Sequence, residues 1–314
     1  MQLELLYLIL GLAGLLIGSE LVIRAILNIS KHYKISHLFL GLVILSIGTD
    51  LPELVVDVTG AIYRLKGIET SGLIIGETIG TCFSQIGLVL GIIALFGLVT
   101  LTKKEIFRDG LMMVSSVVLL MFASYDGIIS RTEGLIFVLI FCLYLLVIYR
   151  EEHLHEKIKR APGVKWFWDV ISIIGGFIII YFGSSAVIDN GLSLATTWGV
   201  SQTIIGITLV GLGTSLPELA IALNALRKGA VKLSAANLIG SNTFDILFTL
   251  GLGSAISGFN VSKSLLTFDI PLLLLFSLLV CYFFYRKMKI QKKEAIILLL
   301  IYFGYIGIKI FTSF

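Results

Sequence analysis

Long apolar stretches separated by short charged or turn-rich segments run through the whole chain. A helix needs about 20 apolar residues to cross the hydrocarbon core of a bilayer, and most of these stretches reach that length. The pattern predicts an all-α membrane protein with ten transmembrane helices. The predicted spans are residues 3–28, 36–62, 70–98, 105–124, 132–149, 168–190, 200–226, 230–258, 264–285 and 294–312. The longest of them must tilt or be interrupted by unwound backbone.

The composition places the chain in the same class. Of its 314 residues, 57% are hydrophobic and 14% are charged, whereas soluble chains carry about 25% charged residues. The first stretch contains Glu4 and no basic residue before Arg24, so it predicts a first span rather than a cleaved leader. Cys82, Cys142 and Cys281 lie inside apolar spans without paired spacing, which favours packing roles over a disulfide framework or a zinc site.

The basic residues are unevenly distributed between the connections. If both termini are outside, the odd-numbered connections are cytoplasmic and hold 19 of the 24 Lys and Arg residues. The five on the other side are Arg64, Lys66, Arg131, Lys263 and Lys309. Because cytoplasmic loops carry an excess of basic residues, we predict a multi-pass protein of the cell membrane with both termini extracellular.

Two sequence blocks occur twice in the chain. Residues 41–54, GLVILSIGTDLPEL, match residues 206–219, GITLVGLGTSLPEL, and residues 76–91 match residues 236–251. Each copy holds five predicted spans, an odd number, so the second copy must enter the membrane from the opposite side. The chain is therefore predicted to consist of two inverted five-helix repeats, 1–150 and 168–314, joined by a cytoplasmic loop at 151–167. Secondary transporters have this architecture, with the substrate site at the midplane where the repeats meet.

A Gly-Thr-x-Leu-Pro-Glu stretch lies in the middle of an apolar span in each copy. Pro52 and Pro217 remove a backbone donor and clash with the preceding turn, so each helix is predicted to break and free carbonyl oxygens at membrane depth. Glu53 and Glu218 follow the prolines, and a charged group at mid-bilayer costs roughly 2.5–3.5 kcal/mol. No Lys or Arg lies at comparable depth in the repeat spans, so these carboxylates predict a cation partner.

The second block places polar side chains at four-residue intervals, which puts each set on one helix face. The two sets are Glu77, Thr81 and Gln85, and Asn237, Ser241 and Asp245. A hard cation such as Ca²⁺ takes about 6–8 oxygen ligands and avoids His and Cys. The two blocks supply such oxygens from Thr49, Asp50, Glu53, Thr81, Thr214, Ser215, Glu218, Ser241 and Asp245.

With these residues assembled, the chain resembles the calcium/cation antiporter superfamily, whose two repeats carry G-T-S-x-P-E and G-[ST]-N-x-x-[ND] elements. The resemblance covers nearly the whole chain. It implies antiport by alternating access, in which the first two spans of each half slide against the other helices. It also implies that Glu53 and Glu218 are the central calcium ligands and that a wider set lines sodium or calcium positions. That set is Thr49, Thr81, Gln85, Thr214, Ser215, Ser241 and Asp245.

The chain departs from the superfamily pattern at several of these positions. Asp50 and Thr81 stand where the superfamily usually has Ser, and Gln85 stands where it has Asn. Four carboxylates around one Ca²⁺ leave two charges uncompensated, so a proton or a monovalent cation is expected as well. Asp50 either contacts an ion or hydrogen-bonds the exposed helix N-termini at the break. Glu77, which stands where the second copy has Asn237, is expected to support the site, as an ion vestibule or paired with Asn237.

The resemblance favours exchange of sodium for calcium, because proton-coupled relatives carry Asn at the position of Asp245. Proton-coupled exchange of calcium or another divalent cation is the alternative. Two further acids, Glu20 and Asp57, are expected to face a water pathway or a helix end rather than an ion.

Other classes of function fit the sequence less well. A channel is expected to show several identical pore-lining repeats, and an enzyme needs a nucleophile with its base or a histidine-rich metal site. The histidines lie at span ends or in loops, and the segment EEHLHE at 151–156 lies in a charged connection. No phosphate-binding loop is present. We therefore expect a transporter rather than an enzyme, embedded in membrane lipid and acting on inorganic cations, with no cofactor, nucleotide or nucleic-acid partner.

Overall fold

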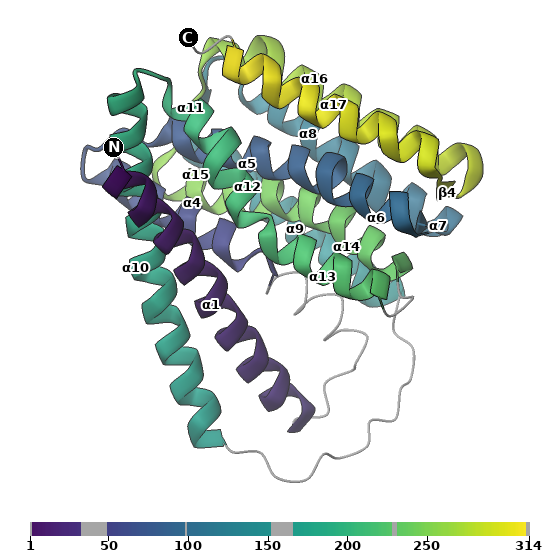
Figure 1. The fold of residues 1–314 in the computed structure, drawn as a ribbon, viewed down its shortest axis with the longest axis horizontal. Helices are drawn as coiled ribbons and strands as arrows, with labels where there is room; N and C mark the ends of the chain where they lie inside the picture. The colour runs from purple at the N-terminus through teal and green to yellow at the C-terminus, as the bar shows by residue number, and fades with distance from the viewer. Residues whose placement is uncertain (1, 33–48, 98, 152–165, 228–230, 312–314) are drawn as a thin grey trace.

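The structure, a computed structural model, describes residues 2–32, 49–97, 99–151, 166–227 and 231–311, which are almost entirely helical (Figure 1). The helices of the first half are α1 (Gln2–His32), α4 (Leu51–Leu65), α5 (Ser71–Phe83), η2 (Ser84–Val89), α6 (Leu90–Phe96), α7 (Lys103–Glu105), η3 (Ile106–Gly110), α8 (Leu111–Ala123) and α9 (Arg131–Glu151). Those of the second half are α10 (Trp166–Trp198), α11 (Gln202–Ile205), η4 (Gly206–Val210), α12 (Gly211–Thr214), α13 (Leu216–Arg227), α14 (Val231–Phe244), η5 (Asp245–Thr249), α15 (Leu250–Ser257), η6 (Leu265–Asp269), α16 (Ile270–Lys287) and α17 (Lys292–Phe311). Elements labelled η are π-helical turns within longer helices.

Eight helical segments in the described part of the chain are long and apolar enough to cross a membrane. They coincide with eight of the ten predicted spans. The other two predicted spans, 36–62 and 230–258, contain α4 and the continuous helix from α14 to α15, and their first residues lie outside the described ranges. The prediction of an all-α membrane protein is confirmed.

Apolar side chains cover the outward faces of several helices. On α9, Leu135, Leu139, Leu143 and Leu146 are each more than half exposed. Their spacing of three or four residues places them in one stripe. Phe137 and Phe141, on the opposite face of α9, are buried. A helix of a soluble protein turns its apolar stripe toward the core, whereas an outward leucine stripe suits contact with acyl chains.

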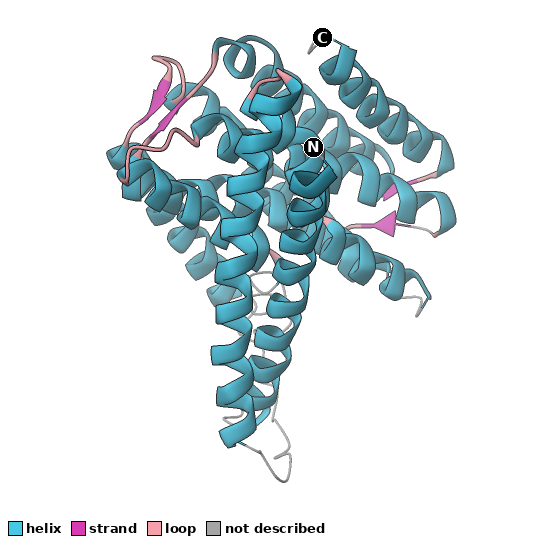
Figure 2. Ribbon diagram, turned by 60° about the vertical axis from the view of Figure 1, so that its left-hand side comes forward, coloured by secondary structure: helices cyan, strands magenta, loops and turns pink. Residues whose placement is uncertain are grey.

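Two short antiparallel ladders connect the halves of the chain. β1 (Val99–Thr100) pairs with β4 (Lys289–Ile290), and β2 (Ile128–Ile129) pairs with β3 (Phe259–Asn260). β1 and β3 occupy equivalent positions in the two copies, as do β2 and β4. Each ladder therefore joins one copy to the other, as a two-fold relation requires. The ladders lie on opposite sides of the helix bundle (Figure 2), which agrees with inverted repeats.

The first helices of the two copies form a pair of their own. α1 and α10 run side by side and project away from the other helices (Figures 1 and 2). A Cβ atom on Gly11 would lie 2.9 Å from the carbonyl oxygen of Gly183, and one on Gly18 would lie 2.8 Å from that of Gly176. Gly11 is equivalent to Gly176, and Gly18 to Gly183. The same contact is thus made twice about a pseudo-two-fold axis, with small residues allowing close backbone approach.

The helix break predicted at the second proline motif is present. α12 ends at Thr214, Ser215 forms a turn, and α13 begins at Leu216 with Pro217 in its first turn. The π-helical turn η4 lies one turn earlier in the same span. Local π-helical turns are frequent at functional sites. In the first copy α4 begins at Leu51 with Pro52 in its first turn, and residues 33–48 before it lie outside the described part.

Candidate cation-binding site

Two carboxylates from opposite halves of the chain lie at the centre of the bundle. Glu53 lies in the first turn of α4 and Glu218 in the first turn of α13, and they are 0% and 1% exposed. They are close enough to interact electrostatically, and none of their four oxygens has a hydrogen-bond partner within the described ranges. An unpaired buried carboxylate costs several kcal/mol of folding free energy. The structure therefore brings these two residues together, as the sequence predicts. A cation bound between them would stabilise both carboxylates.

Asp50 brings a third carboxylate to this pair. Its Oδ1 accepts hydrogen bonds from the hydroxyl groups of Ser241, at 2.9 Å, and Thr49, at 3.2 Å. Its carboxyl group also lies close to that of Glu218. The Asp50 side chain makes no capping hydrogen bond to α4, so the interpretation of Asp50 as a helix cap is wrong. Its direct contact with an ion stays a prediction.

A hydrogen-bonded row of amide and carboxylate groups crosses the boundary between the two copies. Nε2 of Gln85 donates to Oδ2 of Asp245 at 3.0 Å, and Nδ2 of Asn242 donates to Oε1 of Gln85 at 2.6 Å. All three side chains are completely buried. The sequence reasoning omitted Asn242, although it is the Asn of the G-[ST]-N element in the second copy and could have been found from that motif.

Two threonines meet in the same way from opposite copies. The hydroxyl oxygens of Thr81 and Thr214 are 3.2 Å apart, and both hydroxyls lie within hydrogen-bonding range of Oε1 of Glu77, at 3.4 and 3.1 Å. Thr81 also lies 3.3 Å from the carbonyl oxygen of Gly211. Within the described chain, Glu77 is therefore held by Thr81 and Thr214. The predicted pairing of Glu77 with Asn237, which is half-buried on α14, stays a prediction.

The remaining candidate, Ser215, donates its hydroxyl to the carbonyl oxygen of Gly211 at 2.7 Å, within its own helical span. All ten predicted ligands are at most 2% exposed. They are Thr49, Asp50, Glu53, Thr81, Gln85, Thr214, Ser215, Glu218, Ser241 and Asp245. These buried residues belong to four spans, two from each copy.

Asp57 corrects the sequence interpretation. It was expected to face a water pathway or a helix end, but it is 0% exposed, and neither carboxylate oxygen has a hydrogen-bond partner. It lies one turn after Glu53 on α4 and faces Glu77 and Thr249. Four-residue spacing from Glu53 placed it on the same helix face, and this signal could have identified it. Glu20, by contrast, is exposed and pairs with Arg24.

Six buried carboxylates thus occupy the centre of the bundle. They are Asp50, Glu53, Asp57, Glu77, Glu218 and Asp245. Among the described residues, no Lys, Arg or His forms an ion pair with any of them. Two buried acids elsewhere in the described bundle do have basic partners: Asp269 forms an ion pair with Lys309, and Asp109 with Arg108. The absence of basic partners therefore distinguishes the central acids.

The carboxylates do not form a single cage. Within the described ranges, no three acidic, His or Cys side chains surround one point closely enough to hold a metal ion. Two carboxyl pairs face each other instead, Asp50 with Glu218 and Asp57 with Glu77. An ion bound here would take one or two carboxylates and complete its shell with hydroxyl, amide and carbonyl oxygens, as hard cations do.

Glycines bring the helices of the two copies into backbone contact at this centre. Cβ atoms on Gly76 and Gly80 of α5 would lie 2.5 and 2.4 Å from the carbonyl oxygens of Thr203 and Ile207. A Cβ on Gly211 would lie 2.8 Å from both the carbonyl oxygen of Glu77 and the amide nitrogen of Thr81. These contacts set the distance between α5 and the span that carries Thr214 and Glu218.

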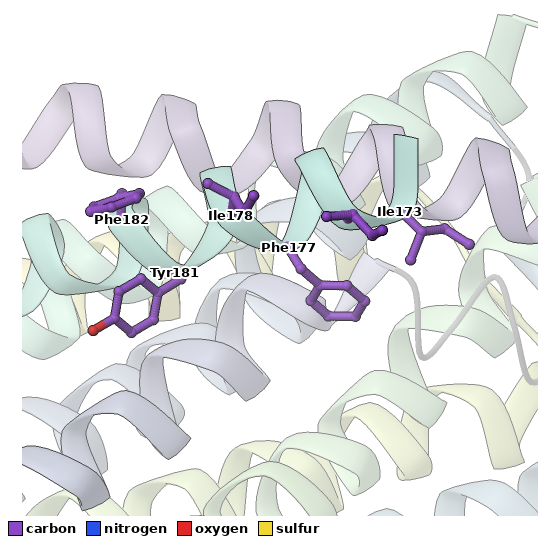
Figure 3. A pocket seen from close by; sticks show the side chains of 6 residues that line it. Ile173, Phe177, Ile178, Tyr181 and Phe182 are labelled. Atoms are coloured by element: carbon purple, nitrogen blue, oxygen red, sulfur yellow. The ribbon is translucent and has the colours of Figure 1, made fainter. Parts of the chain in front are cut away.

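The groove in Figure 3 is unrelated to this cluster. Its lining residues all belong to α10 and are apolar or aromatic: Ile173, Ile174, Phe177, Ile178, Tyr181 and Phe182. Ile174, Phe177, Ile178, Tyr181 and Phe182 are each at least 47% exposed. The groove offers no carboxylate ligand for a cation, and its apolar lining suits contact with lipid.

The fold and the buried acids together define a membrane cation exchanger of the inverted-repeat class. Comparison with known proteins identifies the family: the model of the sodium/calcium exchanger protein family matches residues 3–150 and 168–311, so the chain belongs to this family. The two matched segments are separated by the predicted connecting loop.

Relatives and a solved structure agree with this assignment. The chain is 25% identical to sodium/calcium exchanger MaX1 of Methanosarcina acetivorans, over 96% of this chain and 97% of the relative. It is 28% identical to inner membrane protein YrbG of Escherichia coli, over 89% and 88% of the two chains. The solved structure of the sodium-calcium exchanger NCX_Mj soaked with Na⁺ and Sr²⁺ matches with a TM-score of 0.68 and 28% identity, over 97% of this chain and 98% of that one.

Proposed function

We propose that this protein exchanges sodium for calcium across the cell membrane by alternating access, as a secondary antiporter and not as an enzyme. The observation that carries the proposal is the burial of Glu53 and Glu218, one from each copy, without any basic or hydrogen-bonding partner in the described part of the chain. One Ca²⁺ between them would neutralise both charges. The names of MaX1 and NCX_Mj, both sodium/calcium exchangers, support the same ion pair.

In this proposal Glu53 and Glu218 are shared by calcium and sodium, so that the two ions compete for the same charge. Thr49, Ser241 and Asp50 would supply oxygens from one side of the pair, and Thr81, Thr214 and Ser215 from the other. Asp245, oriented by Gln85, would provide the extra carboxylate for sodium. Competition for shared ligands is what couples the inward movement of one ion to the outward movement of the other.

The glycine contacts of α1 and α10 hold these two helices together as a pair. The pair packs together more than it packs into the remaining bundle (Figure 1). The resemblance implies that the first two spans of each half slide; from this packing we propose that the first span of each half, α1 and α10, moves as one unit against the other helices, exposing the ions alternately to each side. Both termini lie outside in this proposal, and residues 151–167 form the cytoplasmic connection between the repeats 1–150 and 168–314.

Flux into proteoliposomes tests the function and the coupling ion together. Vesicles loaded with sodium should take up radioactive Ca²⁺ when diluted into sodium-free medium, and Glu218→Gln should abolish this uptake. An imposed pH gradient without sodium provides the second arm. Uptake driven by the pH gradient alone, with sodium having no effect, would establish the proton-coupled alternative and overturn the sodium assignment.

A further inference from the structure

Three of the six central acids, Asp50, Asp57 and Glu77, occur in the first copy only, and two of these three, Asp57 and Glu77, lie beside each other. Asp57 and Glu77 are equivalent to Ala222 and Asn237 of the second copy by the offsets of the two sequence blocks. Ala222 is 1% exposed, so the equivalent position is buried in both copies but charged in only one. The central pair, Glu53 and Glu218, has a carboxylate in each copy. Asp57 and Glu77 are therefore carboxylates of the first copy alone, next to a central pair to which both copies contribute.

Asp57 and Glu77 lie close together, on the neighbouring helices α4 and α5. Oδ1 and Oδ2 of Asp57 and Oε2 of Glu77 have no hydrogen-bond partner among the described residues, and both side chains are 0% exposed. The other oxygen of Glu77 is fixed by Thr214 and Thr81. Three unpartnered carboxylate oxygens thus share one buried location, and Thr249 of η5 borders it.

Ionised carboxylates only accept hydrogen bonds, so two that face each other repel unless positive charge, from a cation or a shared proton, lies between them. Nearby hydroxyl groups cannot supply that charge. The hydroxyl of Thr249 donates to the carbonyl oxygen of Asp245, at 2.7 Å, which leaves its oxygen free to serve as a further ligand. Oxygen-only surroundings with two carboxylates suit a hard cation, and a divalent ion would balance both charges.

We propose that Asp57 and Glu77 form a second cation subsite, one helical turn from Glu53, which binds a hard cation in addition to the ion held by Glu53 and Glu218. The subsite rests on the proposed function, because it extends the same ion pathway. α4 runs from Glu53 through Asp57 toward Arg64, which the charge distribution places outside. An ion that enters from the extracellular side therefore reaches the Asp57–Glu77 pair before the central carboxylates.

Counting bound ions tests this subsite directly. Purified protein in lipid nanodiscs is equilibrated with radioactive Ca²⁺, and in a separate arm with radioactive Na⁺, and bound ions per chain are measured at saturation. The double variant Asp57→Asn/Glu77→Gln keeps the side-chain shapes and removes both charges. It should bind one ion fewer per chain than wild type in the arm whose ion occupies the subsite. Asp189→Asn, which removes an exposed acid on α10, should bind as many ions as wild type.

Thermal unfolding provides the second measurement. Removing unpaired buried charges should raise the midpoint of the ion-free protein and reduce the further increase that saturating cation produces. The proposal is overturned if the double variant is folded and binds as many Ca²⁺ and Na⁺ ions as wild type. Failure of the proposed function would be seen in a different measurement, the flux assay. There the Glu218→Gln variant would still exchange sodium for calcium, whatever the number of ions bound at Asp57 and Glu77.

Discussion

Gln85 and Asp245 occupy equivalent positions in the two copies and hydrogen-bond to each other, Nε2 to Oδ2, at 3.0 Å. Equivalent residues can touch only where the pseudo-two-fold axis passes between them. The axis therefore crosses the buried centre at this hydrogen bond, with the carboxylates of both copies around it. The first copy supplies the amide of Gln85 and the second copy the carboxylate of Asp245. The two copies therefore differ in charge at this contact.

Gln85→Met should impair sodium binding, because Asp245 loses its donor while the volume at position 85 is nearly kept. A hydrogen bond to a charged group is worth about 1.5–3 kcal/mol, and ~1.4 kcal/mol is tenfold in affinity. The sodium concentration for half-maximal calcium exchange should rise about tenfold or more. Gln85→Asn, which retains an amide, should be less impaired. Equal sodium dependence of Gln85→Met and wild type would show that this hydrogen bond does not orient a sodium ligand.

Gly211→Ala should separate the two copies at the site. The new Cβ would lie 2.8 Å from backbone atoms of both Glu77 and Thr81, and backbone cannot rotate out of the way as a side chain can. Overpacking of this kind costs about 1–3 kcal/mol of stability. We expect a lower thermal midpoint and strongly reduced calcium flux. Gly240→Ala is the matched control, since nothing lies within 4 Å of its Cβ position. Similar effects of the two substitutions would contradict the assigned contact.

The sequence was informative where the signal is local. Span length, four-residue spacing and the proline motifs predicted the helices, the break before Pro217 and the burial of Glu53 and Glu218. Each follows from the preferences of one segment and from the cost of charge in a membrane. The inverted arrangement followed from the odd number of spans in each copy.

Features that depend on packing between distant segments were missed or misjudged. Asp57 shares a helix face with Glu53, but its complete burial depends on α5, η5 and α15 closing over that face. The strands β1 to β4 are two residues each, too short for an alternating pattern. The contact of Glu77 with Thr214 is set by the close approach of α5 to η4 and α12, which spacing within one block cannot reveal.

Glu69, in the connection between α4 and α5, should make a contribution to the stability of the fold that depends on pH. Burial alone would raise the pKa of Glu69, but hydrogen bonds from Ser71 and the charge of Arg64 lower it below its usual 4.5. A carboxyl group whose pKa is lower in the folded than in the unfolded protein stabilises the fold. The full contribution is present at pH values above the unfolded pKa, and it is lost as the pH falls through the folded pKa. Wild type should therefore exceed Glu69→Gln in thermal midpoint near neutral pH, and the difference should vanish in acid. A difference that is constant with pH would exclude this origin.

The proposed orientation predicts which connections a membrane-impermeant thiol reagent can reach in intact cells. Asn260 of β3 and Arg286 at the end of α16 are both exposed and lie near opposite ladders. The excess of basic residues places the Arg286 connection inside, with Lys287, Lys289 and other basic residues beside it. After replacement of the three native cysteines by Ala, Asn260→Cys should be labelled from outside, and Arg286→Cys should be labelled only after permeabilisation. The opposite pattern would invert the orientation, and labelling of both from outside would contradict the inverted topology itself.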